Sequence, residues 1–136
     1  MAALRADKSS YRDDEFYDIN TTRTTSFDVS KAFASRSCSL EHLSVSYMID
    51  ARHFFDSCRP SYTWPHLRSL ILTAPILTWE NRKQRILKLL TSAGEVALRM
   101  PQLECMALWY SQELRASAAI FQRGQERMPS TLTWRS

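Results

Sequence analysis

The chain has 136 residues, room for one domain, and its hydrophobic share of 44% is enough for a modest core. The net charge of +4 permits contact with nucleic acid or an anionic surface but does not require it. Only two glycines occur, Gly94 and Gly124, and no P-loop or dinucleotide-binding motif can be written with them. Composition therefore argues against glycine-loop nucleotide enzymes and favours a small globular domain.

Three cysteines, Cys38, Cys58 and Cys105, are widely spaced and odd in number. Such a set is a poor disulfide framework and suits a reducing compartment. The N-terminus lacks the apolar core of a signal peptide, and no apolar run approaches the ~18 residues that a membrane span needs. We therefore expect an intracellular protein, cytoplasmic or nuclear, with no membrane partner.

Residues 1–27 are polar and charged without a hydrophobic period, so we expect a flexible arm there. The ordered domain is expected over residues 28–136. It begins with a short helix that Asp28 caps, and the inner face of this helix would comprise Val29, Ala32 and Phe33.

A strand and a helix are expected next. Alternation over residues 43–46 predicts a half-buried strand. Asp50 follows as a helix N-cap, with Ile49 and Phe54 placed to form a hydrophobic staple. The buried face of this helix would comprise Ala51, Phe54, Phe55 and Cys58, and Pro60 would end it.

The next strand lies in residues 67–77, where Leu70 and Leu72 alternate with Ser69, Ile71 and Thr73 until Pro75 ends the ladder. A long amphipathic helix over residues 78–100, with Thr78 as its N-cap, comes next. Its apolar stripe comprises Ile86, Leu89, Leu90, Ala93, Ala97 and Met100, and its polar stripe Arg85, Lys88, Ser92, Glu95 and Arg99. Gly94 would permit close packing or a bend.

A third strand is expected over residues 103–110, a polar turn or loop over 111–116, and a closing β-hairpin formed by 118–124 and 130–136. Strands that alternate with helices in this way are typical of parallel strands joined by right-handed crossovers.

One pattern introduces all three strands: Leu40-x-x-Leu43-x-Val45, Leu67-x-x-Leu70-x-Leu72 and Leu103-x-x-Met106-x-Leu108. It is the L-x-x-L-x-L frame of leucine-rich repeats. The position that regular repeats give to Asn or Cys holds Met48, Pro75 and Ser111 instead. We therefore predict an α/β fold: a short, degenerate leucine-rich-repeat-like stack of parallel strands, with helices on one side and a C-terminal hairpin. The alternative is an ordinary small βαβ domain.

The segments SLEHLSVSYMIDARHFF, WPHLRSLILTAPIL, ALRMPQLECMALWY and STLTWRS resemble the C-terminal region of a group of fungal F-box domain-containing proteins. The resemblance covers roughly residues 28–136. It implies a leucine-rich-repeat-like domain that presents a substrate, while an N-terminal F-box docks on the adaptor of a cullin ubiquitin ligase. Residues 1–27 hold no Leu-Pro-led helical triplet, so we expect no ubiquitin-ligase adaptor as a partner of this chain alone.

The repeat frame also predicts a binding surface, because the outward residues of the three strands fall into rows. The rows are His42, Ser69 and Cys105; Ser44, Ile71 and Ala107; and Ser46, Thr73 and Trp109. In repeat proteins this strand face binds the partner, and Trp is a residue type favoured at interface hot spots. The alternative is that loops or the N-terminal arm cover this face.

Metal and catalytic sites are not expected. The candidate ligands Cys38, His42, His53, Cys58, His66 and Cys105 lack the C-x-x-C or H-x-x-x-H spacing of metal sites. Asp50 is explained as a cap, and no G-x-S-x-G nucleophile motif occurs. We predict no enzyme activity and no cofactor.

The function predicted is therefore a non-catalytic protein-interaction module with an unknown protein partner. A first alternative is nucleic-acid or anionic-surface binding by the basic helix face 82–88, which holds Arg82, Lys83, Arg85 and Lys88. This group lacks an accompanying aromatic stacking pattern, so a solvated outer face is the simpler interpretation. A second alternative is a truncated fragment without independent function.

Overall fold

The computed structural model describes residues 3–6, 27–79, 83–125 and 128–136. Its strands are β1 (Ala3–Ala6), β2 (His42–Val45), β3 (Ser69–Thr73), β4 (Cys105–Gln112), β5 (Arg115–Gln122) and β6 (Thr131–Arg135). Its α-helices are α2 (Phe27–Arg36), α3 (Ala51–Asp56) and α4 (Lys83–Ala97). Two short 3-10 helices, η3 (Ser37–Ser39) and η4 (Pro75–Thr78), follow α2 and β3. The protein is thus an α/β domain.

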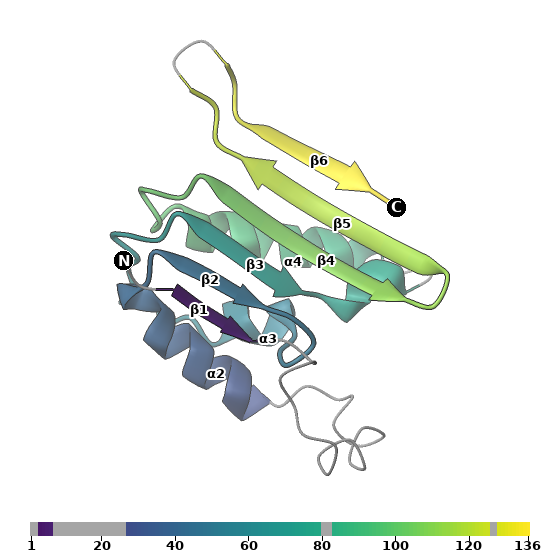
Figure 1. Ribbon diagram of the computed structural model, residues 1–136, viewed down its shortest axis with the longest axis horizontal. Coiled ribbons are helices and arrows are strands. Elements are labelled where there is room, and N and C mark those ends of the chain that lie inside the picture. The colour runs from purple at the N-terminus through teal and green to yellow at the C-terminus, as the bar shows by residue number, and fades with distance from the viewer. Residues whose placement is uncertain (1–2, 7–26, 80–82, 126–127) are drawn as a thin grey trace.

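All six strands form one mixed sheet in the order β1-β2-β3-β4-β5-β6 (Figure 1). The first four strands are parallel to one another, and β5 and β6 are antiparallel to their neighbours. The predicted parallel strands and closing hairpin are therefore confirmed. Each strand from β2 onward pairs with the strand that precedes it in the chain, because consecutive elements usually lie next to each other in space.

The register places the apolar residues of the L-x-x-L-x-L frame beside one another. Leu43, Leu70 and Met106 form one row, and Val45, Leu72 and Leu108 form the next. All six side chains are buried. Residues two apart on a strand point to the same face of the sheet, so both rows lie on one face. Because these side chains are part of the buried core, that face is the one that α3 and α4 cover.

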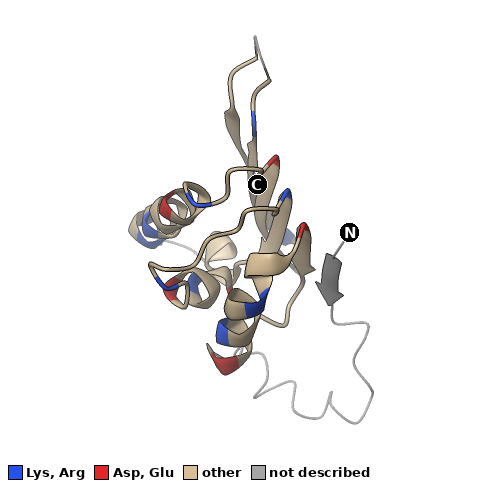
Figure 2. Ribbon diagram, turned by 90° about the vertical axis from the view of Figure 1, so that its left-hand side faces the viewer, with Lys and Arg blue, Asp and Glu red and all other residues tan. Residues whose placement is uncertain are grey.

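The helices lie on one side of the sheet, and the opposite side faces the viewer in Figure 1. Figure 2 shows the layers edge-on. The largest fully buried side chains between these layers include Trp64, Phe54, Leu67, Ile76, Met100 and Leu103. Within the described residues, the helices are too short and too polar to span a membrane.

The edge of the sheet differs from expectation. Residues 3–6, in the segment predicted to be a flexible arm, form β1 and pair with β2 from Ala3↔His42 to Ala6↔Val45. The first strand of the repeat frame is therefore not an unpaired edge. Phe27, the last residue of the predicted arm, begins α2. Residues 1–2 and 7–26 lie outside the described residues.

One helix cap is confirmed and two are wrong. The Asp50 carboxylate accepts a hydrogen bond from the backbone N–H of Arg52 and caps α3. Thr78 instead ends η4, where its hydroxyl donates to the Pro75 carbonyl, and α4 is described from Lys83. Asp28 lies inside the first turn of α2 and not at the N-cap position. A carboxylate there interacts favourably with the helix dipole.

The inner face of α2 was also predicted wrongly in part. Ala32 is exposed, and the buried residues of the helix are Ser30 and Ala34. Hydrophobic periodicity fails here because a serine occupies an inner position of the helix. In α4 the predicted stripe is confirmed at Leu89 and Ala93, but Val96 is buried as well.

The polar segment 111–116 is mostly strand. β4 continues to Gln112 and β5 begins at Arg115, joined by Glu113 and Leu114. Glu113 has a left-handed backbone with φ 50°, as tight hairpin turns require. Residues 111–116 are exposed, so hydrophobic alternation could not reveal these strand ends.

Candidate functional site

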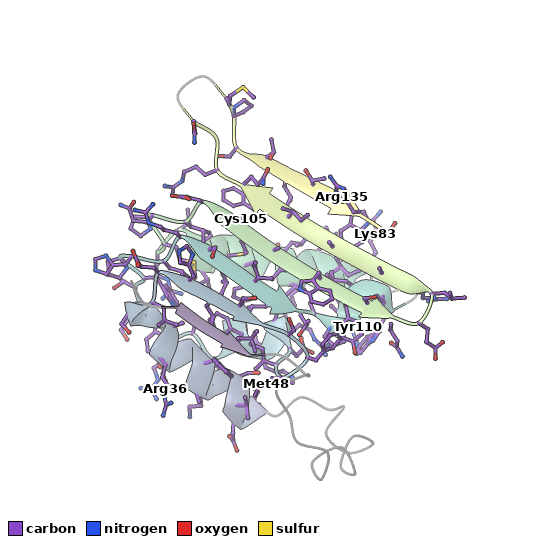
Figure 3. All side chains as sticks on the ribbon, viewed as in Figure 1. Arg36, Met48, Lys83, Cys105, Tyr110 and Arg135 are labelled. Carbon is purple, nitrogen blue, oxygen red and sulfur yellow. The ribbon has the colours of Figure 1, made fainter. Side chains whose placement is uncertain are left out.

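The uncovered face of β2, β3 and β4, here called the open face, contains two of the three predicted rows. His42 pairs with Ser69 and Ser69 with Cys105, while Ser44 pairs with Ile71 and Ile71 with Ala107. These six side chains are half-buried. Figure 3 shows the face from the front, with Cys105 near the start of β4 and Tyr110 near its end.

The third row is only partly as predicted. Thr73 pairs with Trp109, but β2 ends at Val45, so Ser46 lies beyond the ladder. Thr73 is completely buried, and its hydroxyl donates to the Ile49 carbonyl (2.9 Å) and accepts from the Tyr47 backbone N–H (2.9 Å). Thr73 is therefore a structural residue and is not available to a partner.

The open face has no charged residue and combines polar side chains with apolar ones. β2, β3 and β4 contain no Lys, Arg, Asp or Glu, and Figure 2 shows the charges on the helices and at the ends of strands. Its polar end is marked by the His42 Nδ1 and the Ser69 Oγ, which lie 2.7 Å apart in a hydrogen bond.

Strand β5 widens this face. Ile120 lies opposite Ala107, and Ala118 lies opposite Trp109. Residues directly opposite each other in an antiparallel pair share a face, so both side chains extend the apolar surface. Sequence reasoning missed them because it did not anticipate that β4 and β5 would pair.

Tyr47 flanks Trp109 at the end of the open face. The two rings meet edge-on with centroids 5.5 Å apart, and Tyr110 lies 5.6 Å from Tyr47 on another side. The Tyr47 hydroxyl donates to the Ser111 carbonyl (3.1 Å). Tyr47 has a φ of 64°, uncommon for a residue with a side chain, so the surrounding contacts hold it there. No periodic signal in the sequence could have identified this residue.

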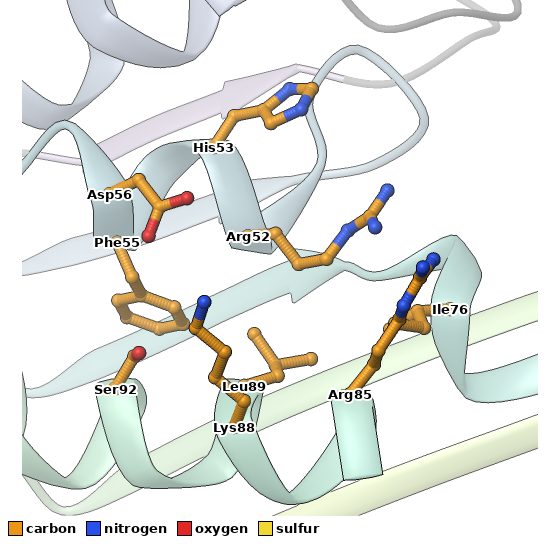
Figure 4. A pocket seen from close by; sticks show the side chains of 9 residues that line it. All are labelled: Arg52, His53, Phe55, Asp56, Ile76, Arg85, Lys88, Leu89 and Ser92. Carbon is orange, nitrogen blue, oxygen red and sulfur yellow. The ribbon is translucent and has the colours of Figure 1, made fainter. Parts of the chain in front are cut away.

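A second feature lies on the other side of the molecule, between α3 and α4 (Figure 4). Two adjoining cavities of about 290 Å³ and about 470 Å³ share Phe55, Asp56 and Ser92. We call them together the helix groove. The smaller cavity is also lined by Arg52, His53, Ile76, Arg85, Lys88 and Leu89.

The cations of the helix groove have different environments. Arg52 is held by Asp50, with Nη2–Oδ2 and Nε–Oδ2 distances of 2.6 Å and 3.0 Å. Its guanidinium also lies 4.9 Å from the ring centroid of Trp79. Arg85 and Lys88 form no ion pair or hydrogen bond within the described part of the chain. These two are the cations of the smaller cavity that have no ion-pair partner among the described residues.

The predicted basic face is therefore divided. Arg85 and Lys88 are exposed, as expected of a solvated face, and they also line the smaller cavity of the groove. Lys83 is exposed at the start of α4, and Arg82 lies outside the described residues.

Burial affects the acidity of all three cysteine thiols. Burial raises the pKa of the Cys58 thiol to about 12, outweighing the opposing effect of the nearby Arg99. Burial also raises the pKa of Cys38 and of Cys105. All three thiols are free, and they remain protonated at neutral pH.

The ligand candidates weighed from the sequence do not converge on a metal site in the described residues. No group of three His, Cys, Asp or Glu side chains there is arranged to hold a metal ion. Asp50 is engaged by Arg52 and caps α3.

The fold and the open face together define a small α/β domain with a mixed sheet, helices on one face and, on the other, an open face whose strands β2, β3 and β4 contain no charged residue. The chain belongs to the family of unknown function DUF6546, whose match covers residues 3–136. No curated protein and no solved structure matches the chain.

Proposed function

We propose that this protein is a non-catalytic protein-interaction module that binds its partner on the open face. The observation that carries the proposal is the row-by-row alignment of uncharged, half-buried side chains on β2, β3 and β4. No described helix or strand lies over these strands on the side that faces the viewer in Figure 1. The cores of protein interfaces are depleted in charge in the same way.

The partner that fits this surface is a protein segment with apolar, uncharged side chains. Ile71, Ala107 and Ile120 supply an apolar centre, and Trp109 supplies a large ring that Tyr47 already holds in place. A ring that is fixed before binding loses less conformational entropy in the complex. The His42–Ser69 pair would lie at the polar rim.

The resemblance to fungal F-box proteins would make this domain a substrate-recognition part, and we keep that role within the proposal. Parallel strands in register support a leucine-rich-repeat-like arrangement, and the two antiparallel strands at the end would close it. An intracellular location belongs to the same proposal and agrees with three free thiols.

A charge placed on the open face tests the proposal. Ala107→Arg would project a long cation from the centre of the face, and Ala32→Arg on the exposed side of α2 is the matched control. We expect a protein captured by the wild-type chain to be lost with Ala107→Arg and retained with Ala32→Arg, at equal thermal stability. Capture of the same proteins by both variants would overturn the proposal.

A second candidate function, binding of nucleic acid or an anionic surface, is supported by the exposed Arg85 and Lys88 on α4, which form no ion pair among the described residues. It requires retention on a heparin column at low salt, falling steeply as salt rises. The double variant Arg85→Gln/Lys88→Gln should then elute earlier than the wild type. Equal elution of both proteins would end this second candidate.

A further inference from the structure

We propose that the helix groove binds a small amphipathic anion, in which one phosphate or carboxylate group is joined to an apolar body. This ligand would lie on the opposite side of the sheet from the open face. The inference is therefore independent of the protein-binding function.

Arg85 and Lys88 would bind the anionic group of the ligand. They stand three residues apart on α4, so they lie on one side of the helix. Figure 4 shows both among the side chains that surround the smaller cavity, with Arg52 across from them on α3. Like charges held together repel, and an anion between them would remove that repulsion. Charge-assisted hydrogen bonds from a guanidinium and an ammonium are also among the strongest in proteins.

Arg52 is held in place and already neutralised. Its bonds to Asp50 and its position over Trp79 fix its guanidinium at the groove. The Asp50 carboxylate offsets its charge. Within the smaller cavity, the cations without an ion-pair partner among the described residues are therefore Arg85 and Lys88. A single anionic group suffices to bridge these two side chains.

Buried apolar side chains of the groove would contact the apolar body of the ligand. Phe55, Ile76 and Leu89 line the smaller cavity, and Val96 lines the adjoining one. All four are buried. Small-molecule sites typically combine such apolar linings with a few polar groups that fix the ligand's orientation. A bare phosphate would leave these side chains unused, whereas an amphipathic anion would contact them.

Asp56 supplies a way to increase binding. It is an exposed carboxylate that lines both cavities, and it forms no ion pair within 4.0 Å among the described residues. Its charge opposes an incoming anion. Asp56→Asn is therefore expected to raise affinity, an effect that general damage to the fold would not produce.

The test is displacement of the fluorescent probe 1-anilinonaphthalene-8-sulfonate by octyl phosphate, measured on the full chain. We expect octyl phosphate to displace the probe at concentrations about tenfold or more below those needed with 1-octanol or inorganic phosphate. The double variant Arg85→Gln/Lys88→Gln should lower the affinity for octyl phosphate by about tenfold or more. Asp56→Asn should raise this affinity, and the control Lys31→Gln on α2 should leave it unchanged.

Equal displacement by octyl phosphate and 1-octanol, with no effect of the charge variants, would overturn the inference. So would binding only to phosphatidylglycerol vesicles, or stronger displacement by an oligonucleotide than by octyl phosphate. The open-face variant Ala107→Arg should bind octyl phosphate normally. Failure of the protein-binding proposal is thus distinguishable from failure of this one.

Discussion

The indole N–H of Trp64 donates to the hydroxyl of Ser37 across 2.7 Å, between two side chains that are completely buried. Ser37 in turn donates to the Ala34 carbonyl (2.8 Å). The backbone N–H of Trp64 donates to the Arg99 carbonyl (3.0 Å), and the Arg99 guanidinium lies 5.4 Å from the Trp64 ring centroid. Trp64 therefore joins the end of α2 to the segment that follows α4, on the side of the sheet that holds the core.

Ser37→Ala tests that link. The substitution leaves the buried indole N–H without its partner, which costs about 1–3 kcal/mol of unfolding free energy. Urea denaturation measures the loss. Ser35→Ala is the matched control, because Ser35 makes a similar bond to the Ala32 carbonyl but is exposed, and we expect it to cost less than about 0.5 kcal/mol. Equal losses in the two variants would contradict the assigned role of Ser37.

Thr73→Val tests the hydroxyl that holds Tyr47 beside Trp109. The valine has nearly the same shape but loses the bonds to the Ile49 carbonyl and the Tyr47 N–H, so we expect a loss of about 1–3 kcal/mol. Thr91→Val is the control, because the Thr91 hydroxyl bonds the Leu87 carbonyl on the exposed side of α4. Urea denaturation separates the two, and a Thr73→Val protein as stable as the control would refute the assignment.

Gly94→Ala should stabilise the protein. Gly94 lies within α4, and an added Cβ would meet nothing within 4 Å. The close packing that a glycine in a helix can permit is therefore not used at this position. Alanine is the better helix former by up to about 1 kcal/mol. A rise in the urea midpoint is the expected result.

Gly124→Ala is the contrasting variant. There a Cβ would collide with the backbone of Met128 and Pro129, so we expect the connection between β5 and β6 to be disturbed. A destabilised Gly94→Ala protein would contradict the open space described around Gly94. A Gly124→Ala protein as stable as the wild type would contradict the close backbone contacts described at Gly124.

Cys58 should be the thiol most resistant to alkylation. With its pKa raised to about 12, its thiolate fraction at pH 8.5 is far below that of a free thiol, and its reaction with iodoacetamide should be slower by about a hundredfold or more. Mass spectrometry of the labelled peptides gives the three rates. Labelling of Cys58 as fast as that of free cysteine in the same buffer would be the contrary result.

The same pKa predicts a direction for stability. The folded pKa lies above the ordinary value of 9.0, so the stabilising effect is complete below about pH 9 and decreases as pH rises toward 12. Between pH 9 and 10.5, the urea midpoint of the wild type should fall more steeply than that of Cys58→Ala. Parallel slopes would exclude Cys58 as a contributor.

The sequence predicted best those elements whose buried residues follow a simple period. Leu43, Val45, Leu70 and Leu72 alternate on strands buried on one face, and Asp50 has the position and chemistry of a cap. Both signals are local, so they can be read without knowing the rest of the fold. The row-by-row alignment of β2, β3 and β4 followed from the same frame.

What could not be predicted depends on contacts between distant segments. The pairing of β1 with β2 joins Ala3 to His42, and β5 joins the open face through Ile120 opposite Ala107. The helix groove requires α3 and α4 to lie side by side, so Arg85 and Lys88 resembled an ordinary solvated face. The position of Tyr47 likewise depends on Thr73, which comes 26 residues later.

Site-specific photo-crosslinking tests the central claim, that a protein partner binds on the open face. A benzoylphenylalanine introduced at position 107, at the centre of the face, should crosslink a protein in cells that express the chain. The same group at position 32, on the exposed side of α2, should not. Crosslinks of equal yield from both positions, or a partner captured only from position 32, would contradict the claim.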